Sequence, residues 1–255
     1  MILRRPASSS SSTPHPVVNS SSCDEGITFS LHSRSPAWGL RSVSKIRVCT
    51  LYGSLHVQVG NAANYTSDDW KTDIHLAQQA QIDAFALNIA YKEANIESSL
   101  PTAFSAAAGM GFKLFFSFDY AGNGAWPKDE VDSMLEKYTA LSAYFKYNGK
   151  YLVSTFEGPD SADDWIDLKN DRNVFFIPDW SSLGAKAALT RGGGVADGLF
   201  SWAAWPWGPQ DMDTYTDASY LQYLNGKPYM MPISPWFFTN LPGYNKNWLW
   251  RGDSL

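Results

Sequence analysis

Three carboxylates stand at the ends of apolar runs and are the residues best placed for acid–base chemistry: Asp119, Glu157 and Asp179. Such runs predict buried strands, and parallel strands bring their carboxyl ends to one edge of a sheet. Carboxylates gathered there cannot all ionise at low cost, so at least one pKa should rise. An acid and a base would then coexist at one pH, as glycoside hydrolysis requires. Taken singly, each acid has the alternative role of capping the next helix or pairing with an arginine.

Tryptophans surround the same predicted strand ends, and 15% of the 255 residues are aromatic. Rigid aromatic faces with polar edges suit the binding of sugar rings, although packing over the mouth of the fold is the alternative for each of them. A histidine in the first predicted strand and an asparagine at the end of the second add hydrogen-bonding groups. The predicted substrate-binding residues are His56, Asn88, Trp180, Trp202, Trp205 and Trp236.

Other functional classes lack their signatures. With 20 basic and 25 acidic residues the net charge is -5, whereas nucleic-acid binding needs a basic face. No apolar run reaches the roughly 18 residues that a membrane helix needs. The two cysteines and four histidines form no metal-ligand cluster. The sequence also lacks the G-x-S-x-G, H-E-x-x-H and G-x-G-x-x-G motifs. We therefore expect no nucleic acid, no membrane span, no metal and no cofactor.

Seven β-rich apolar runs alternate with amphipathic stretches after residue 50. The predicted strands are residues 55–59, 83–89, 113–120, 150–157, 174–180, 198–205 and 229–236, and the predicted helices begin at Thr66 or Ser67 and then cover 96–109, 128–146, 161–170, 181–190 and 213–224. This alternation predicts an α/β fold, a (β/α)₈ TIM-type barrel, with its chemistry at the C-terminal strand ends. A doubly wound open sheet is the alternative, but its usual glycine-rich phosphate turn is missing after the first strand.

The chain divides into two parts by composition. Residues 1–50 are rich in serine and proline and are expected to form a disordered leader, whereas residues 51–255 form the barrel. The barrel is expected to be incomplete, with about seven βα units, because a closed barrel needs eight strands. A C-terminal truncation is therefore predicted. No secretion signal is visible, since serines and not an apolar segment follow the basic residues at the start.

Several blocks, in order along the chain, resemble glycoside hydrolase family 71, the fungal α-1,3-glucanases or mutanases. The resemblance covers about 55–255, and His56 matches a family histidine, although the residues before Leu55 do not match. The blocks that carry it are Gly60-Asn61, Tyr65-Thr66, Asp69-Trp70, Asp73-Ile74, residues 82–88, Lys113 to Tyr120, residues 154–158, residues 176–180 and residues 197–202.

The resemblance implies an extracellular or cell-wall enzyme, expected to be a monomer, that hydrolyses α-1,3-glucosidic bonds with inversion. Inversion uses an acid and a base about 6.5–9.5 Å apart. The family carries that pair in a Trp-Asn-Asp-Tyr-Gly-Glu block, which this sequence lacks. Asp119, Glu157 and Asp179 would then be supporting acids, and the chain could be inactive. The alternatives are a non-catalytic glucan-binding barrel and a hydrolase of another polysaccharide on the same scaffold.

Overall fold

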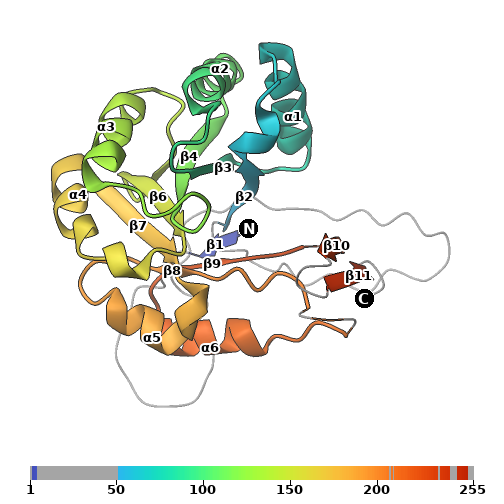
Figure 1. Cartoon of the computed structure of the whole chain (residues 1–255), viewed down its shortest axis with the longest axis vertical. Helices are drawn as coiled ribbons and strands as arrows, with labels where there is room; N and C mark the ends of the chain where they lie inside the picture. The colour runs from blue at the N-terminus through green and yellow to red at the C-terminus, as the bar shows by residue number, and fades with distance from the viewer. Residues whose placement is uncertain are drawn as a thin grey trace, which may run out of the picture.

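A curled sheet with helices packed around its outside forms the body of the molecule (Figure 1). The computed structural model describes residues 2–4, 51–206, 208, 210–234, 236–241 and 246–251. Seven strands within these residues run parallel: β2 (Leu51–Gln58), β3 (Ala84–Ala90), β4 (Lys113–Asp119), β6 (Lys150–Phe156), β7 (Val174–Asp179), β8 (Leu199–Phe200) and β9 (Tyr229–Met231). The seven predicted strands are thus confirmed in type and order, and the fold is of the α/β barrel class.

The sheet closes on itself through the pairing of β4 with β6. The short β5 (Lys146–Tyr147) pairs antiparallel with the beginning of β6. Between β2 and β9 lies β1 (Ile2–Arg4), antiparallel to both. These three residues are the described part of the predicted leader, and they form a strand, whereas disorder was expected. The rest of that leader, 5–50, lies outside the described residues, so its assignment stays a prediction.

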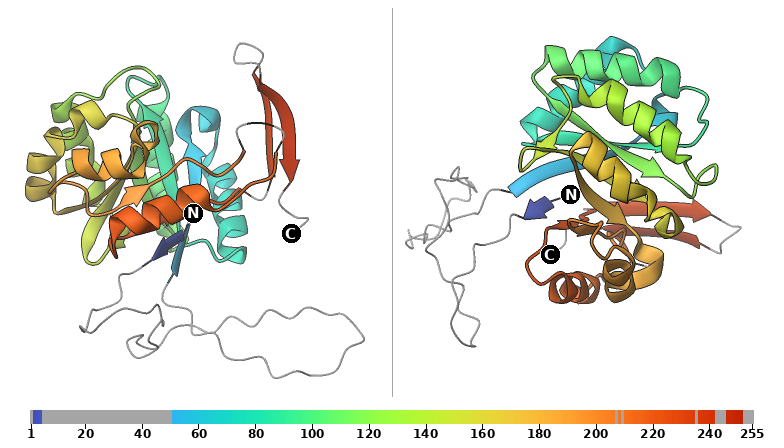
Figure 2. Two further views of the ribbon diagram at one scale, coloured as in Figure 1. Left: turned by 90° about the horizontal axis from the view of Figure 1, so that it is seen from below. Right: turned by 90° about the vertical axis from the view of Figure 1, so that its left-hand side faces the viewer.

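Helices follow the parallel strands and cover the outside of the sheet (Figures 1 and 2). They are α1 (Ser67–Gln79), α2 (Ile96–Gly109), α3 (Lys128–Thr139), α4 (Asp164–Arg172), α5 (Gly184–Arg191) and α6 (Tyr215–Leu224), with 3₁₀ turns η1 (Val59–Ala62), η2 (Pro159–Ser161) and η3 (Ser181–Leu183). The expected start of α1 is confirmed: the Thr66 hydroxyl accepts from the Asp69 amide, and the Asp69 carboxylate accepts from the Thr66 amide.

The third helix is shorter than the sequence pattern predicts. α3 ends at Thr139, although its apolar stripe continues toward residue 146. The sheet takes the chain after it: the amide of Leu114 in β4 donates to Ala143 at 2.9 Å, and the Phe145 amide donates to Leu114 at 2.8 Å. The chain turns back toward β6 at this point. The hydrogen bonds to β4 therefore stabilise the backbone more than a continued helix would.

The last two parallel strands are also shorter than predicted. β8 and β9 end at Phe200 and Met231, and the residues after them leave the sheet as loops. A hairpin of β10 (Trp236–Leu241) and β11 (Lys246–Arg251) then stands apart from the barrel, as a separate two-stranded sheet (Figure 2). The loops that leave β8 and β9 supply part of the pocket described next.

Aromatic packing fills the space between sheet and helices. Trp165 of α4 stacks on Phe176 of β7 with ring centroids 4.0 Å apart, and both side chains are fully buried. The parallel strands β3, β4 and β7 bury all but one of their residues, and β6 buries the four at its centre, because helices cover one face and the barrel interior covers the other. The rigid sheet therefore holds the strand ends, and the side chains on them, at fixed positions.

Candidate active site

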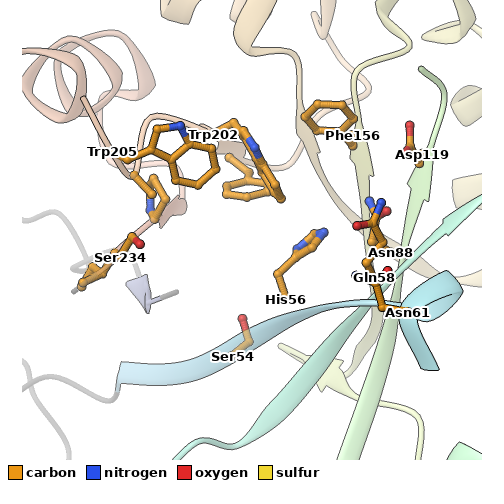
Figure 3. Close-up of a pocket in the computed structure, with 14 residues that line it drawn as sticks. Ser54, His56, Gln58, Asn61, Asn88, Asp119, Phe156, Trp202, Trp205 and Ser234 are labelled. Atoms are coloured by element: carbon orange, nitrogen blue, oxygen red, sulfur yellow. The ribbon is translucent and has the colours of Figure 1, made fainter. Parts of the chain in front are cut away.

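A pocket of about 540 Å³ opens at the C-terminal ends of the strands (Figure 3). This is the end at which barrel enzymes carry out their chemistry. One wall is polar and comes mainly from β2, β3 and β4. The facing wall is aromatic and comes from β6, β8 and the loop after β8. The polar wall consists of Ser54, His56, Gln58, Asn61, Asn88 and Asp119.

Strand periodicity and register explain the polar wall. Ser54, His56 and Gln58 lie two residues apart on β2, so their side chains share the face that looks into the barrel. The register pairs Gln58 with Asn88 of β3, which brings the two amides together at the same level. Asn61 joins them from η1, where Asn95 of α2 donates to the Val59 carbonyl at 3.2 Å and fixes the turn.

His56 brings an unpartnered imidazole to the pocket. Both of its ring nitrogens are buried, and neither has a hydrogen-bond partner within the described structure. Burial lowers the pKa of His56 to about 4, so the ring is neutral at physiological pH and offers one donor and one acceptor. Trp202 packs edge-on against this ring, with centroids 4.7 Å apart.

Asp119 is a pocket carboxylate that also shapes its own loop. Its Oδ1 accepts hydrogen bonds from the amides of Ala121 and Gly122, both at 2.8 Å. Gly122 fits there because a Cβ would lie 2.8 Å from the Cβ of Ala90. The carboxylate is thereby held in one orientation at the end of β4 (Figure 3).

Four aromatic rings form the facing wall: Phe156, Phe200, Trp202 and Trp205. Trp202 lies at the centre of this group, with ring centroids 5.0 Å from Phe156, 5.5 Å from Phe200 and 5.9 Å from Trp205. Edge-to-face contacts at these distances are favourable and restrict each ring. The wall is thus a preformed apolar surface opposite the hydrogen-bonding groups.

The other two predicted acids lie outside the pocket lining. Phe156 pairs with Asp119 across the sheet, and its side chain faces the pocket. Glu157 is the next residue along the chain and has a positive φ of 54°. The Glu157 carboxylate accepts from the amide and hydroxyl of Ser182 at 3.0 and 2.5 Å. Of the three carboxylates expected to converge, only Asp119 lines the pocket, whereas Glu157 lies beside Asp179, whose carbonyl accepts from the Glu157 amide at 2.8 Å.

Asp179 is fully buried, and its Oδ1 accepts from the amide and hydroxyl of Ser181, whereas its Oδ2 has no partner. Burial raises the pKa of Asp179 to about 8, and the charge of Glu157 adds to that increase. The expected rise of one carboxyl pKa is thus found at Asp179, but it arises mainly from burial and not from crowding of acids. The neutral form predominates at pH 7.

Trp180, one of the predicted tryptophans, does not belong to the aromatic wall. The side chain of Trp180 is fully buried, and its ring contacts Phe176 with centroids 6.1 Å apart. Trp180 therefore packs in the core, which differs from its expected role in substrate binding. Trp236 begins β10, but its side chain lies outside the described residues, so its role stays a prediction.

Several pocket residues were not predicted from the sequence: Ser54, Gln58, Asn61, Phe156, Phe200, Ala204, Pro232, Ile233 and Ser234. Alternation along β2 from His56 would have found Ser54 and Gln58. Register with Asp119 would have found Phe156. The residues after β9 carry no such signal, because they lie in a loop.

Two further observations concern the described part of the chain. No helix in it is long and apolar enough to cross a membrane. Within the same residues, no three histidine, cysteine, aspartate or glutamate side chains gather as a metal-ion site.

The curled parallel sheet, the helices around it and the pocket at its C-terminal strand ends define an α/β barrel protein. In keeping with this, the fold is similar to the GH99 endo-α-mannosidase of Bacteroides thetaiotaomicron, with a TM-score of 0.56 over 72% of this chain and 61% of that chain. Sequence identity to that structure is 14%, so the similarity concerns the fold alone.

The chain belongs to glycosyl hydrolase family 71, whose sequence pattern matches residues 53–255. It is 34% identical to a mutanase of Penicillium rubens over 211 residues, which cover 80% of this chain and 46% of the mutanase. It is 35% identical to a glucan endo-1,3-α-glucosidase of Schizosaccharomyces pombe over 217 residues, which cover 78% of this chain and 50% of that enzyme. The chain spans about half the length of the curated relatives it matches.

Proposed function

We propose that this chain binds α-1,3-glucan in the pocket and takes part in hydrolysis of its α-1,3-glucosidic bonds. The observation that carries the proposal is the pairing of a polar wall with an aromatic wall across one cavity. Sugar rings have hydroxyls at their edges and apolar C–H faces, which match the two walls. The family and the names of the relatives supply the linkage.

The residues have separate roles in this proposal. Trp202 and Trp205 stack on the apolar faces of the glucan, while His56 and Asn88 hydrogen-bond its hydroxyls. Asp119 faces the bound sugar as the pocket carboxylate and either stabilises positive charge that develops on the ring or assists proton transfer. Glu157 and Asp179 support the site from behind the aromatic wall.

Glucan binding without turnover is the second candidate, and one specific observation favours it. Among the described residues that line the pocket, Asp119 is the single carboxylate, whereas inverting hydrolysis uses two groups about 6.5–9.5 Å apart. In this case the pocket would retain the polysaccharide and release no sugar.

We further propose action outside the cell, at the fungal wall. One relative, 26% identical over 217 residues, is named an ascus wall endo-1,3-α-glucanase of Schizosaccharomyces pombe. We also propose that the chain acts as a monomer.

Incubation of the full chain with insoluble α-1,3-glucan tests the proposal. Release of reducing sugar that is lost in Asp119→Asn supports hydrolysis through this pocket. Sedimentation of the chain with the glucan, without sugar release, supports the second candidate. A chain that neither sediments with the glucan nor releases sugar from it would overturn both candidates.

A further inference from the structure

We infer that Ser181 is a positioning residue that holds Trp202 in the pocket wall, with Asp179 as the buried anchor for Ser181. The effect of this arrangement on glucan binding rests on the function proposed above. Neither Ser181 nor Asp179 lines the pocket itself. Trp202 lies on an irregular loop after β8, so a contact outside the regular sheet must hold it in position.

The hydroxyl of Ser181 links two strand ends. Ser181 begins η3 directly after β7, and its hydroxyl donates to Oδ1 of Asp179. A hydroxyl has one proton and two lone pairs, so it can still accept a hydrogen bond. It accepts one from the backbone amide of Trp202 at 2.8 Å. The loop after β8 is therefore tied to the end of β7 through one side chain.

Trp202 needs such a bond because the sheet no longer holds it. β8 consists of Leu199 and Phe200 only, and regular pairing has ended before Trp202. On the other side of the loop, the Ser201 hydroxyl lies 2.8 Å from the Tyr229 hydroxyl, which anchors the neighbouring residue to β9. The two serine contacts thus fix consecutive residues of the loop.

Asp179 lies between two strands that carry rings of the pocket wall. The register pairs Asp179 with Phe156 on one side and with Phe200 on the other, and both of these rings line the pocket. Trp202 contacts the same two rings. Trp202 and Asp179 therefore share the same two neighbours, and Asp179 itself does not line the cavity. Full burial keeps this anchor from moving with the loop.

The neighbouring serine supplies a matched control. Ser182 also donates its hydroxyl to a carboxylate, that of Glu157, at 2.5 Å, and it belongs to the same 3₁₀ turn. Among the described residues the Trp202 amide donates to Ser181, so Ser182→Ala removes an equivalent serine–carboxylate bond and leaves the Trp202 amide bonded. Ser181→Thr keeps a hydroxyl at the inferred position.

The experiment compares these variants in the full chain by two measurements. Hydrogen exchange at the backbone amide of Trp202 should be about 10-fold faster in Ser181→Ala than in the parent chain. It should be unchanged in Ser182→Ala and in Ser181→Thr. Sedimentation with insoluble α-1,3-glucan should show about 3- to 10-fold weaker binding for Ser181→Ala alone, the range that one lost hydrogen bond gives. If Ser181→Ala does not fold, Ser181→Cys, with a weak sulfur acceptor, should show the same changes to a smaller degree.

The two measurements separate this inference from the proposed function. Unchanged exchange at Trp202 in the folded Ser181 variants would overturn the positioning role, whatever the binding result. Faster exchange together with no glucan binding by any variant, the parent chain included, would support the positioning role and overturn the proposed function. Equal weakening of binding in the Ser181 and Ser182 alanine variants would also contradict the inference.

Discussion

Replacement of Asp179 by asparagine should make the protein more stable at neutral pH and less stable in acid. The folded chain holds this carboxyl with a pKa raised to about 8, because it is fully buried. In the unfolded chain its pKa is about 3.9. Since the folded pKa is the higher one, the contribution to stability is fully present below about pH 4 and is lost as the pH rises through about 8.

The size of the effect follows from that difference. Between about pH 4 and pH 7 the unfolded chain gains about 1.4 kcal/mol per pH unit by ionising Asp179, or about 4 kcal/mol in all, while the folded chain keeps the proton. Asparagine cannot ionise, so the variant does not lose this stability. Its amide oxygen can still accept from Ser181, but its NH₂ replaces the unpartnered Oδ2 and costs about 1–3 kcal/mol.

The expected difference in the free energy of unfolding therefore changes sign with pH. Asp179→Asn should be about 1–3 kcal/mol more stable than the parent at pH 7 and about 1–3 kcal/mol less stable at pH 4. Urea denaturation at several pH values measures this difference, and the titration of His56 is common to both proteins and cancels. A difference that stays constant from pH 4 to pH 7 would refute the reasoning.

Asp69 provides a control of opposite sign. Hydrogen bonds from the Thr66 side chain and backbone lower the pKa of Asp69 in the capping box of α1. Its contribution to stability is present above the unfolded pKa and is lost as the pH falls. Asp69→Asn should therefore destabilise the protein at pH 7, where Asp179→Asn stabilises it.

Three further predictions concern single contacts. Gly158→Ala should lower the free energy of unfolding in urea titrations by more than about 1 kcal/mol, because φ is 86° and a Cβ would lie 2.4 Å from Cγ of Tyr120. An unchanged free energy of unfolding would show that the loop relaxes. Thr66→Ala should cost about 1 kcal/mol by removing the cap of α1, and an unchanged thermal midpoint would contradict that role. His56→Ala should weaken glucan sedimentation without changing the overall circular dichroism, and full binding by this variant would remove His56 from the proposed site.

The fold could be predicted from the sequence where local pattern and tertiary structure agree. Apolar runs buried on both faces identified the parallel strands. In α1, Trp70, Ile74 and Ala77 follow the 3.6-residue period and are buried together. The pattern failed where the sheet competed for the backbone, as after Thr139. It also did not show the hairpin of β10 and β11, which lies beyond the last predicted strand.

The site could be predicted in part, because a sequence shows where a strand ends but not which way its last side chain points. Asn88 and Asp119 reach the pocket as expected, whereas Glu157 follows the inward-facing Phe156 and turns to Ser182. Asp179 shares the inward face but is covered by a loop from another strand. Side chains covered in this way depend on long-range packing, which periodicity does not report.

Sedimentation with three insoluble glucans tests the central claim most directly, namely that the pocket between Trp202 and His56 recognises α-1,3-glucan. The full chain and Trp202→Ala would be mixed with α-1,3-glucan, β-1,3-glucan and α-1,4-glucan, and the unbound protein would be measured. The account predicts that α-1,3-glucan retains the chain at least about 10-fold more strongly than the other two and that Trp202→Ala loses this preference. Equal retention by all three glucans, or full retention of Trp202→Ala, would contradict it.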